Sequence, residues 1–143
     1  MYTIEEFDIQ KTKVFKYIMF KKRTESEIRN KFRTQIEEDM LDDIIEYLKE
    51  AGYINDYSFI EKQVNEYMNL KNMSIQELKY KLMGKGLDKK LIEKYIEEHR
   101  EELEEYERKS AEHIKQKKAS QMDEQEIEQY LYKKGYTNRG GEF

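Results

Sequence analysis

The sequence predicts an all-α protein built from tandem three-helix, helix-turn-helix-like repeats, with an incomplete last repeat. Three observations support this fold class. A helix-start pattern recurs three times at nearly constant spacing, the 143 residues contain no proline, and apolar residues recur at intervals of three and four. With 41% charged and only 37% hydrophobic residues, several small cores are expected instead of one large core.

Each helix-start pattern is a capping box, in which a side-chain oxygen and a glutamate three residues later satisfy free backbone N–H groups. The boxes begin at Thr24, Ser74 and Asp123, so they lie 50 and 49 residues apart. An apolar residue follows each box directly, and another follows four residues later. These pairs are Ile28 and Phe32, Leu78 and Leu82, and Ile127 and Leu131. One helical unit is therefore predicted to be used three times.

Three helices are predicted in the first repeat. Val14 and Ile18 belong to an apolar stripe that places the first helix at roughly residues 11–22. The Thr24 box opens the second helix. The third ends at Gly52, which can adopt the left-handed conformation of a helix C-terminus. Its apolar stripe consists of Met40, Leu41, Ile44, Ile45 and Leu48.

The second repeat follows the same plan. Asp56 is expected to cap the fourth helix, Ser74 opens the fifth, and Asp88 caps the sixth. Gly84 and Gly86 should stop the fifth helix. The predicted inner faces carry Ile60, Val64, Tyr67, Met68, Leu78, Leu82, Leu91, Ile92, Tyr95 and Ile96.

The third repeat is less regular. Residues 88–119 lack both glycine and proline, so one long helix and two helices with a bend near residues 99–103 are both compatible with the sequence. We favour the bend, because the heptad pattern is too short for a coiled coil. Asp123 opens an eighth helix and Gly135 closes it, whereas residues 137–143 cannot supply the apolar face of a ninth. The predicted boundaries are a lead-in at 1–11 and repeats at 12–55, 56–98 and 99–143.

Composition argues against most catalytic and membrane classes. The absence of cysteine excludes disulfides, thiolate zinc sites and cysteine nucleophiles, and no apolar run approaches the ~20 residues that span a bilayer. The N-terminus lacks a secretion signal pattern, so a soluble cytoplasmic protein is expected. His99 and His113 are too far apart to suggest a metal site, and Gly84-Lys85-Gly86 lacks the form of a phosphate loop. We therefore expect no enzyme, no metal and no cofactor.

Charge alternates along the chain in step with the repeats, although the net charge is only −4. Residues 11–33 carry a net +7 and residues 79–94 a net +4, whereas residues 37–50 and 97–107 each carry −6. We interpret the two basic blocks as one continuous basic stripe, which is the candidate partner-binding surface. The alternative is that they are solvent-exposed helix faces whose charge is balanced by neighbouring acidic residues. The stripe residues are Lys21, Lys22, Arg23, Arg29, Lys31, Arg33, Lys79, Lys81, Lys85 and Lys89.

A set of tyrosines could stack on nucleic-acid bases, but at helical spacing they are favoured as fillers of the repeat cores or of the packing between repeats. They are Tyr47, Tyr53, Tyr57, Tyr67, Tyr80 and Tyr95.

Three segments together resemble the RecX family of bacterial recombination regulators. They are residues 20–32, the Gly52-Tyr53-Ile54-Asn55-Asp56 junction with Phe59, and residues 73–92, and the resemblance extends over roughly residues 14–136. It implies a curved, elongated array of three-helix repeats that binds the groove of a RecA–DNA filament. It also implies inhibition of ATP hydrolysis, strand exchange and co-protease activity, with no catalysis of its own.

The expected partner is thus a RecA-type recombinase filament, with single- or double-stranded DNA as a further candidate; no membrane contact is expected, and the chain is expected to be a monomer. Two alternatives remain open. The first is a helix-turn-helix-like DNA-binding module, against which stand the negative net charge and the apolar character of Ile28 and Phe32. The second is a helical adaptor for an unrelated partner.

Overall fold

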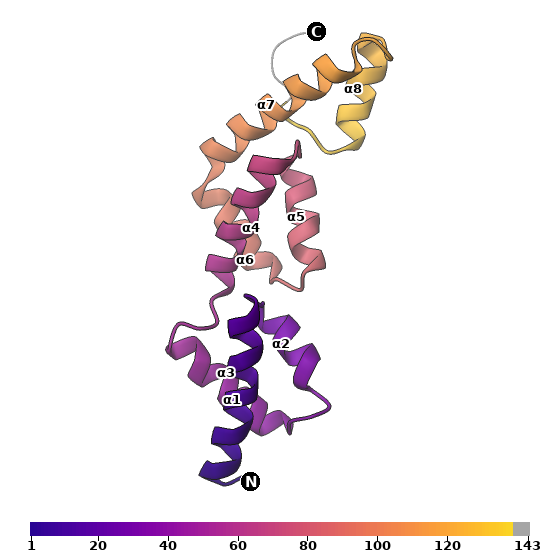
Figure 1. Cartoon of the computed structure of the whole chain (residues 1–143). Helices are drawn as coiled ribbons and strands as arrows, with labels where there is room; N and C mark the ends of the chain where they lie inside the picture. Colours follow the sequence, from indigo (N-terminus) through magenta and orange to yellow (C-terminus); the bar gives the residue numbers. More distant parts are fainter. Residues whose placement is uncertain (139–143) are drawn as a thin grey trace. The chain divides into compact units, whose positions relative to one another are not determined.

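The computed structural model describes residues 1–138, which form eight helices and no strand (Figure 1). The helices are α1 (Ile4–Phe20), α2 (Glu25–Phe32), α3 (Glu38–Glu50), α4 (Asp56–Leu70), α5 (Ile75–Gly84), α6 (Lys89–Glu98), α7 (Arg100–Lys118) and α8 (Glu124–Lys133). The all-α prediction and the order of the helices are confirmed. The expectation of no ninth helix falls mostly on residues 139–143, outside the described residues.

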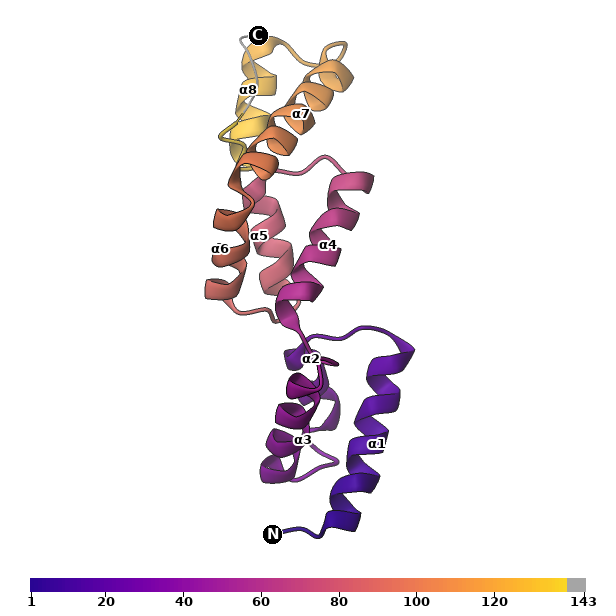
Figure 2. The ribbon, with the colours of Figure 1, turned by 90° about the vertical axis from the view of Figure 1, so that its left-hand side faces the viewer.

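The helices belong to two compact units, which are described separately. Unit 1 comprises residues 1–59 with the short segment 85–87, and unit 2 comprises residues 60–84 and the described residues from 88 onward. In unit 1, α1, α2 and α3 pack around one apolar core (Figure 2). That core contains Val14, Ile18, Ile28, Phe32, Ile36, Met40, Leu41, Ile44, Ile45, Leu48 and Ile54.

All three predicted capping boxes are confirmed. The hydroxyl of Thr24 accepts from the N–H of Glu27 at 3.1 Å, and the Glu27 carboxylate accepts from the N–H of Thr24 at 3.0 Å. The same reciprocal pairs join Ser74 to Glu77 and Asp123 to Glu126. Each box satisfies two N–H groups that a helix start leaves without a partner.

Helix α1 begins at Ile4, seven residues earlier than the sequence pattern indicated. Thr3 caps it by accepting from the N–H of Glu6 at 3.1 Å. The extra turns are stabilised by aromatic packing, in which Phe7 stacks on Tyr2 and meets the edge of Tyr47. Because Phe7 packs against Tyr47 of α3 and against Tyr2 before the helix, these contacts do not appear in the local periodicity of α1.

The start of α4 differs from the prediction that Asp56 caps it. Asn55 is the capping residue, since its side-chain oxygen accepts from the N–H of Ser58 at 3.0 Å. Asp56 is the first helical residue, and its carboxylate instead accepts from the N–H of Glu25 at 3.0 Å. Asp56 therefore links the start of α4 to the start of α2.

In unit 2 the predicted bend between α6 and α7 is confirmed. His99 separates the two helices with φ −120° and ψ 26°. Its ring stacks on Tyr95 with centroids 4.0 Å apart, and its Nδ1 lies 2.9 Å from the Tyr95 carbonyl oxygen. Because this arrangement satisfies the groups at the break, the chain turns without glycine or proline.

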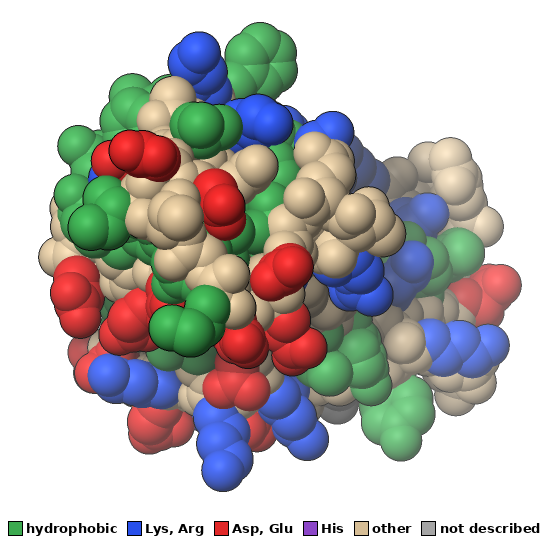
Figure 3. Space-filling model, turned by 90° about the horizontal axis from the view of Figure 1, so that it is seen from below, with side chains coloured by type: hydrophobic (Ala, Val, Ile, Leu, Met, Phe, Trp, Pro, Cys, Tyr) green, Lys and Arg blue, Asp and Glu red, His purple; other side chains and the backbone are tan. Residues whose placement is uncertain are grey.

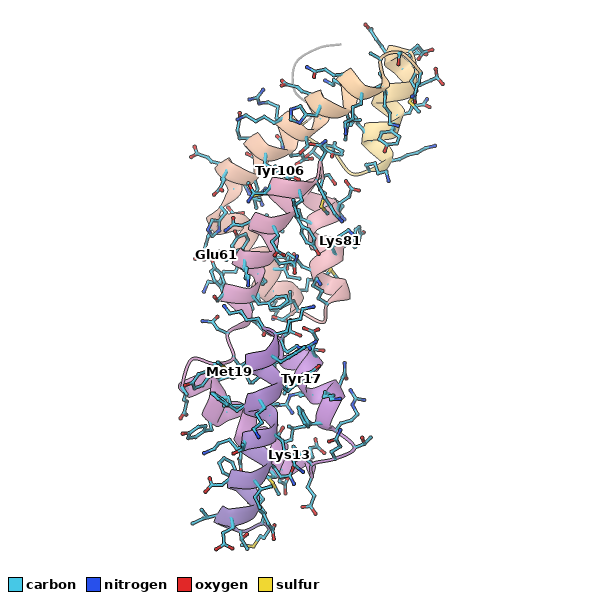
Figure 4. All side chains as sticks on the ribbon, viewed as in Figure 1. Lys13, Tyr17, Met19, Glu61, Lys81 and Tyr106 are labelled. Atoms are coloured by element: carbon cyan, nitrogen blue, oxygen red, sulfur yellow. The ribbon has the colours of Figure 1, made fainter. Side chains whose placement is uncertain are left out.

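Helix α7 holds two connections of unit 2 in place. The hydroxyl of Tyr106 donates to the Lys71 carbonyl at 2.6 Å and accepts from the N–H of Met73 at 3.0 Å, which fixes the turn between α4 and α5 (Figure 4). The next residue of α7, the fully buried Glu107, accepts from the N–H of Thr137 at 2.7 Å and from the Asn138 amide at 3.2 Å. The segment after α8 is thereby tied to α7.

A recurring contact places the loop after one helix against the capping residue of another. In unit 1 the Thr24 hydroxyl donates to the Lys85 carbonyl at 3.4 Å; in unit 2 the Ser74 hydroxyl donates to the Lys134 carbonyl at 2.6 Å. Both carbonyls directly precede a glycine with positive φ, Gly86 at +82° and Gly135 at +88°. This pairing has the same period as the capping boxes.

Candidate partner-binding surface

The first basic block surrounds the turn between α1 and α2 in unit 1. Lys21 and Lys22 are exposed in this turn. The Arg23 guanidinium lies over the Tyr17 ring, 4.3 Å from its centroid, and the Lys31 ammonium lies 5.7 Å from the same centroid. Tyr17 is itself fixed edge-on against the buried Phe32, 5.5 Å between centroids. The ring therefore holds two cations from different elements on one surface.

Ion pairing divides the predicted stripe residues into two groups. Arg29 donates to Glu25 at 3.0 Å and to Asp42 at 2.6 Å, and Lys79 lies 3.3 Å from Glu93. The charges of Arg29 and Lys79 are thus largely balanced within their own units. The remaining eight stripe residues form no ion pair with any carboxylate of residues 1–138: Lys21, Lys22, Arg23, Lys31, Arg33, Lys81, Lys85 and Lys89.

The ion pairs of Arg29 also shift the pKa values of Arg29 and Glu25. The hydrogen bond to Asp42 outweighs burial and raises the pKa of Arg29. Burial opposes ionisation of Glu25, but hydrogen bonds from Lys49 and Arg29 together outweigh it and lower the pKa of Glu25. Glu25 is therefore ionised at neutral pH, and Arg29 is already committed to contacts within the chain.

In unit 2 the second basic block lies on α5 and at the start of α6. Lys81 projects from α5 with its ammonium 5.8 Å from the Tyr67 ring of α4 (Figure 4). Lys89 is exposed in the first turn of α6. Lys85 belongs to unit 1, where its carbonyl accepts from Thr24 and its side chain is half-buried. Lys85 therefore belongs to the same unit as residues 21–33, whereas Lys79, Lys81 and Lys89 belong to unit 2, where Lys79 contacts α6 and Lys81 contacts α4.

One face of unit 1 is unsuited to an anionic partner. Asp39, Asp42 and Asp43 line a shallow pocket with Met1 and Tyr2, and the Tyr2 hydroxyl donates to Asp43. Figure 3 looks onto this end of the chain and shows acidic and hydrophobic side chains side by side. The acidic residues that line this pocket come from α3, outside the basic block.

The candidate tyrosines are mostly not core residues. Tyr95 is buried, at 3% exposure, but Tyr80 is 62% exposed, so the expectation of core filling is wrong for Tyr80. Tyr47 and Tyr53 are about half exposed and pack their edges or faces against Phe7 and Phe15. A tyrosine in a thin helical layer can keep one edge in water, which explains why spacing alone did not distinguish these cases.

The described residues bear on two other kinds of site, a DNA-reading helix and a metal centre. Ile28 and Phe32, the positions that α2 would present to a groove, are 0% and 4% exposed. No group of three potential metal-ligating side chains is found in residues 1–138, and no helix in this range is long and apolar enough to cross a membrane.

Sequence reasoning missed two features. The first is the pairing of each cluster of cations with a tyrosine, which requires Tyr17 of α1 to meet Lys31 of α2 across the repeat. The second is a set of lysines outside the predicted stripe, Lys71, Lys117 and Lys118, at the C-terminal ends of α4 and α7. The lysines gathered in the last turn of α7, Lys115, Lys117 and Lys118, were the available signal for the second feature.

Among curated proteins, the chain is similar to several that are named regulatory protein RecX. That of Finegoldia magna is 35% identical over 95 residues, which are 66% of this chain and 44% of the relative. That of Listeria monocytogenes is 30% identical and covers 88% of this chain and 49% of its own length; for Staphylococcus carnosus the values are 28%, 91% and 53%. The chain spans about half the length of these relatives. No protein-family model matches the chain.

Two solved structures share the fold. RecX from Lactobacillus salivarius superposes with a TM-score of 0.79 at 22% identity, covering 94% of this chain and 91% of the other. A second structure, of a regulatory protein RecX, gives a TM-score of 0.72 at 21% identity, covering 90% and 69%. At these identities the likeness establishes the arrangement of helices.

Proposed function

We propose that this chain, which belongs to the RecX family of regulatory proteins, binds a RecA-type recombinase filament as a monomer and inhibits it without catalysing a reaction. The observation that carries the proposal is the set of cations around the α1–α2 turn. Lys21, Lys22, Arg23 and Lys31 form no ion pair within residues 1–138, so their charge is available to a partner.

Binding is steric and electrostatic. A filament presents the same surface on every subunit, and this chain offers cations in both units, at Lys21 and Lys22 in unit 1 and at Lys81 and Lys89 in unit 2. Each contact is individually weak, because exposed charge pairs contribute about 1 kcal/mol or less. Because the two units are covalently linked, binding of one raises the effective concentration of the other, so several weak contacts together can give tight binding. A bound chain then hinders the subunit movements that accompany ATP hydrolysis.

Direct reading of duplex DNA by α2 is less well supported. The residues that such a helix would expose, Ile28 and Phe32, belong to the core of unit 1. Phosphate contacts by Lys21 and Lys22 remain compatible with a filament that contains DNA. The recombinase filament is therefore the partner that accounts for both the family relationship and the exposed charge.

The test is DNA-stimulated ATP hydrolysis by the cognate recombinase with substoichiometric amounts of the chain. We expect strong inhibition by the parent protein and about tenfold weaker inhibition by the double variant Lys21→Glu, Lys22→Glu. Arg23 is left intact because its Nε is buried and its guanidinium packs on Tyr17. Thermal unfolding should be nearly unchanged, since both replaced side chains are exposed.

The matched control is Lys62→Glu with Lys109→Glu. Both lysines are exposed and outside the stripe, and the double substitution changes the net charge by the same amount. The control should inhibit like the parent. No inhibition by a folded parent protein would refute the proposal. If both double variants lost inhibition equally, the effect would come from net charge and not from the stripe residues.

A further inference from the structure

Unit 2 contains an open groove of about 720 Å³ where the C-terminal ends of α4 and α7 meet α8. Its lining combines lysines with apolar side chains and includes no acidic residue. The lining includes Leu70, Lys71, Ile114, Lys117, Lys118 and Tyr130. None of the three lysines belongs to the predicted stripe.

Charge in this groove is not balanced locally. Lys71, Lys117 and Lys118 form no ion pair with a carboxylate of the described chain. Their positions at helix C-termini are favourable in themselves, because the helix dipole attracts cations there. That effect does not account for Leu70, which ends α4 with 79% of its surface exposed beside them.

Tyrosine rings hold some of these cations in place. The Lys118 ammonium lies 4.7 Å from the Tyr130 centroid, and that of Lys134 lies 5.7 Å from it. The Lys71 ammonium lies 5.8 Å from the Tyr67 centroid, and the Lys81 ammonium lies at the same distance from that centroid. Cations fixed on rings lose less side-chain entropy when they bind an anion, so the groove is prepared for a negatively charged ligand.

We propose that this groove binds an acidic peptide segment of a partner protein, with carboxylates facing Lys71, Lys117 and Lys118 and an apolar side chain packed on Leu70 and Ile114. Charge complementarity selects an acidic occupant, and the exposed leucine selects one that also carries an apolar side chain. The proposal goes beyond the filament contact proposed above, because it concerns other residues and a partner defined by its chemistry.

A peptide fits better than single-stranded nucleic acid. Nucleic acid would use the Tyr130 ring as a stacking surface, but Lys118 already lies over that ring. A phosphate backbone also has no use for the aliphatic surface of Leu70 and Ile114. Both features suit a segment in which acidic and apolar side chains alternate.

The experiment measures fluorescence anisotropy of a short fluorescein-labelled peptide in which glutamate alternates with leucine. The parent chain should bind it, and a peptide with glutamine in place of glutamate should bind about tenfold more weakly. The double variant Lys71→Glu, Lys118→Glu should lose at least about tenfold in affinity for the glutamate peptide. Leu70→Ala should lose about fivefold, since it removes only the apolar contact.

Two further variants keep the result interpretable. Lys71→Ala with Lys118→Ala removes the charge without placing carboxylates at helix C-termini, so it tests binding if the charge reversal disturbs folding. Lys62→Glu with Lys90→Glu matches the charge change of the reversal at exposed positions outside the groove and should leave affinity unchanged.

Three outcomes would overturn the proposal: no binding of the glutamate peptide by the folded parent, equal weakening by the groove and control variants, or displacement of the peptide by oligothymidylate that binds more tightly through the same lysines. The last outcome would assign the groove to nucleic acid. The peptide assay contains no recombinase, so a negative result in it does not bear on the filament proposal. A negative result in the ATPase test likewise does not bear on peptide binding in the groove.

Discussion

Two junctions in this chain each place a loop against the start of a capped helix, but they use different hydrogen-bonding side chains. The first, in unit 1, consists of Thr24, Asp56, Lys85 and Gly86; the second, in unit 2, consists of Ser74, Tyr106, Lys134 and Gly135. In each, a capping hydroxyl donates to a lysine carbonyl, and the following glycine lies against the start of the capped helix. The repeat therefore extends beyond the helices, because the same hydrogen bond between a capping hydroxyl and a lysine carbonyl occurs in both units.

The junctions differ in the group that satisfies the backbone near the capped helix. In the first, the Asp56 carboxylate accepts from the N–H of Glu25. In the second, the Tyr106 hydroxyl accepts from the N–H of Met73 and also donates to the Lys71 carbonyl. One junction therefore depends on an ionisable group in the acidic pH range, and the other uses a neutral one. A carboxylate and a hydroxyl can both fill this role because each bond requires only an acceptor oxygen.

Replacing the junction glycines should give the largest effects. Gly86 and Gly135 have positive φ, and an added Cβ would overlap Ser26 in one case and lie 2.7 Å from the Gln76 Cβ in the other. Gly86→Ala and Gly135→Ala should each lower the free energy of unfolding by about 2–4 kcal/mol, from backbone strain and overpacking together. Urea denaturation followed by circular dichroism measures this loss.

Gly52 is the matched reference for these two positions. Its φ is +84°, but nothing lies within 4 Å of an added Cβ. Gly52→Ala should therefore cost only the backbone strain, about 1–2 kcal/mol. Equal losses at all three glycines would show that the close approach in the junctions contributes nothing.

Removing the capping hydroxyls should give intermediate effects and separate the two junctions. Ser74→Ala loses a cap and the 2.6 Å hydrogen bond to the Lys134 carbonyl, so the loss should be about 2 kcal/mol. Thr24→Ala breaks a longer bond of 3.4 Å to the Lys85 carbonyl and should cost less through that bond. Chemical denaturation of both variants measures the difference.

Asp123→Ala provides the reference for a cap alone. Asp123 is exposed and its carboxylate accepts from the N–H of Glu126, so its removal should cost about 1 kcal/mol. If Ser74→Ala were no more destabilising than Asp123→Ala, the hydrogen bond to Lys134 would carry no stability.

The sequence was sufficient for the helices and insufficient for the junctions. Capping boxes at Thr24, Ser74 and Asp123 and the apolar residues that follow them are local signals, and they correctly predicted the starts of α2, α5 and α8. Asp56 was expected to cap its own helix because a local rule cannot reveal that its carboxylate contacts Glu25, 31 positions away. For the same reason the sequence identified the stripe lysines but could not distinguish the ion-paired Arg29 and Lys79 from the unpaired Lys21 and Lys22.

The smallest expected effect is a pH dependence that only the first junction should show. Burial raises the pKa of Asp56, although the hydrogen bond from the N–H of Glu25 opposes this. The folded state then holds the proton more tightly than the unfolded state, so this group stabilises the fold at low pH and the contribution is lost as the pH rises from about 4. Asp56→Asn keeps an acceptor oxygen and removes the charge. Its stability relative to the parent should therefore increase between pH 4 and pH 7 in urea denaturation.

Tyr106→Phe makes the corresponding change at the second junction. Burial raises the pKa of Tyr106 above the ordinary value for tyrosine, so its hydroxyl stays neutral throughout this pH range. The variant should cost about 1–3 kcal/mol, because the N–H of Met73 loses its partner, and this cost should not vary between pH 4 and pH 7. A constant difference for Asp56→Asn as well would mean that both junctions behave as neutral contacts. A difference that grows for Asp56→Asn alone would show that matching positions in two repeats place a proton-sensitive contact in one unit and a proton-insensitive contact in the other.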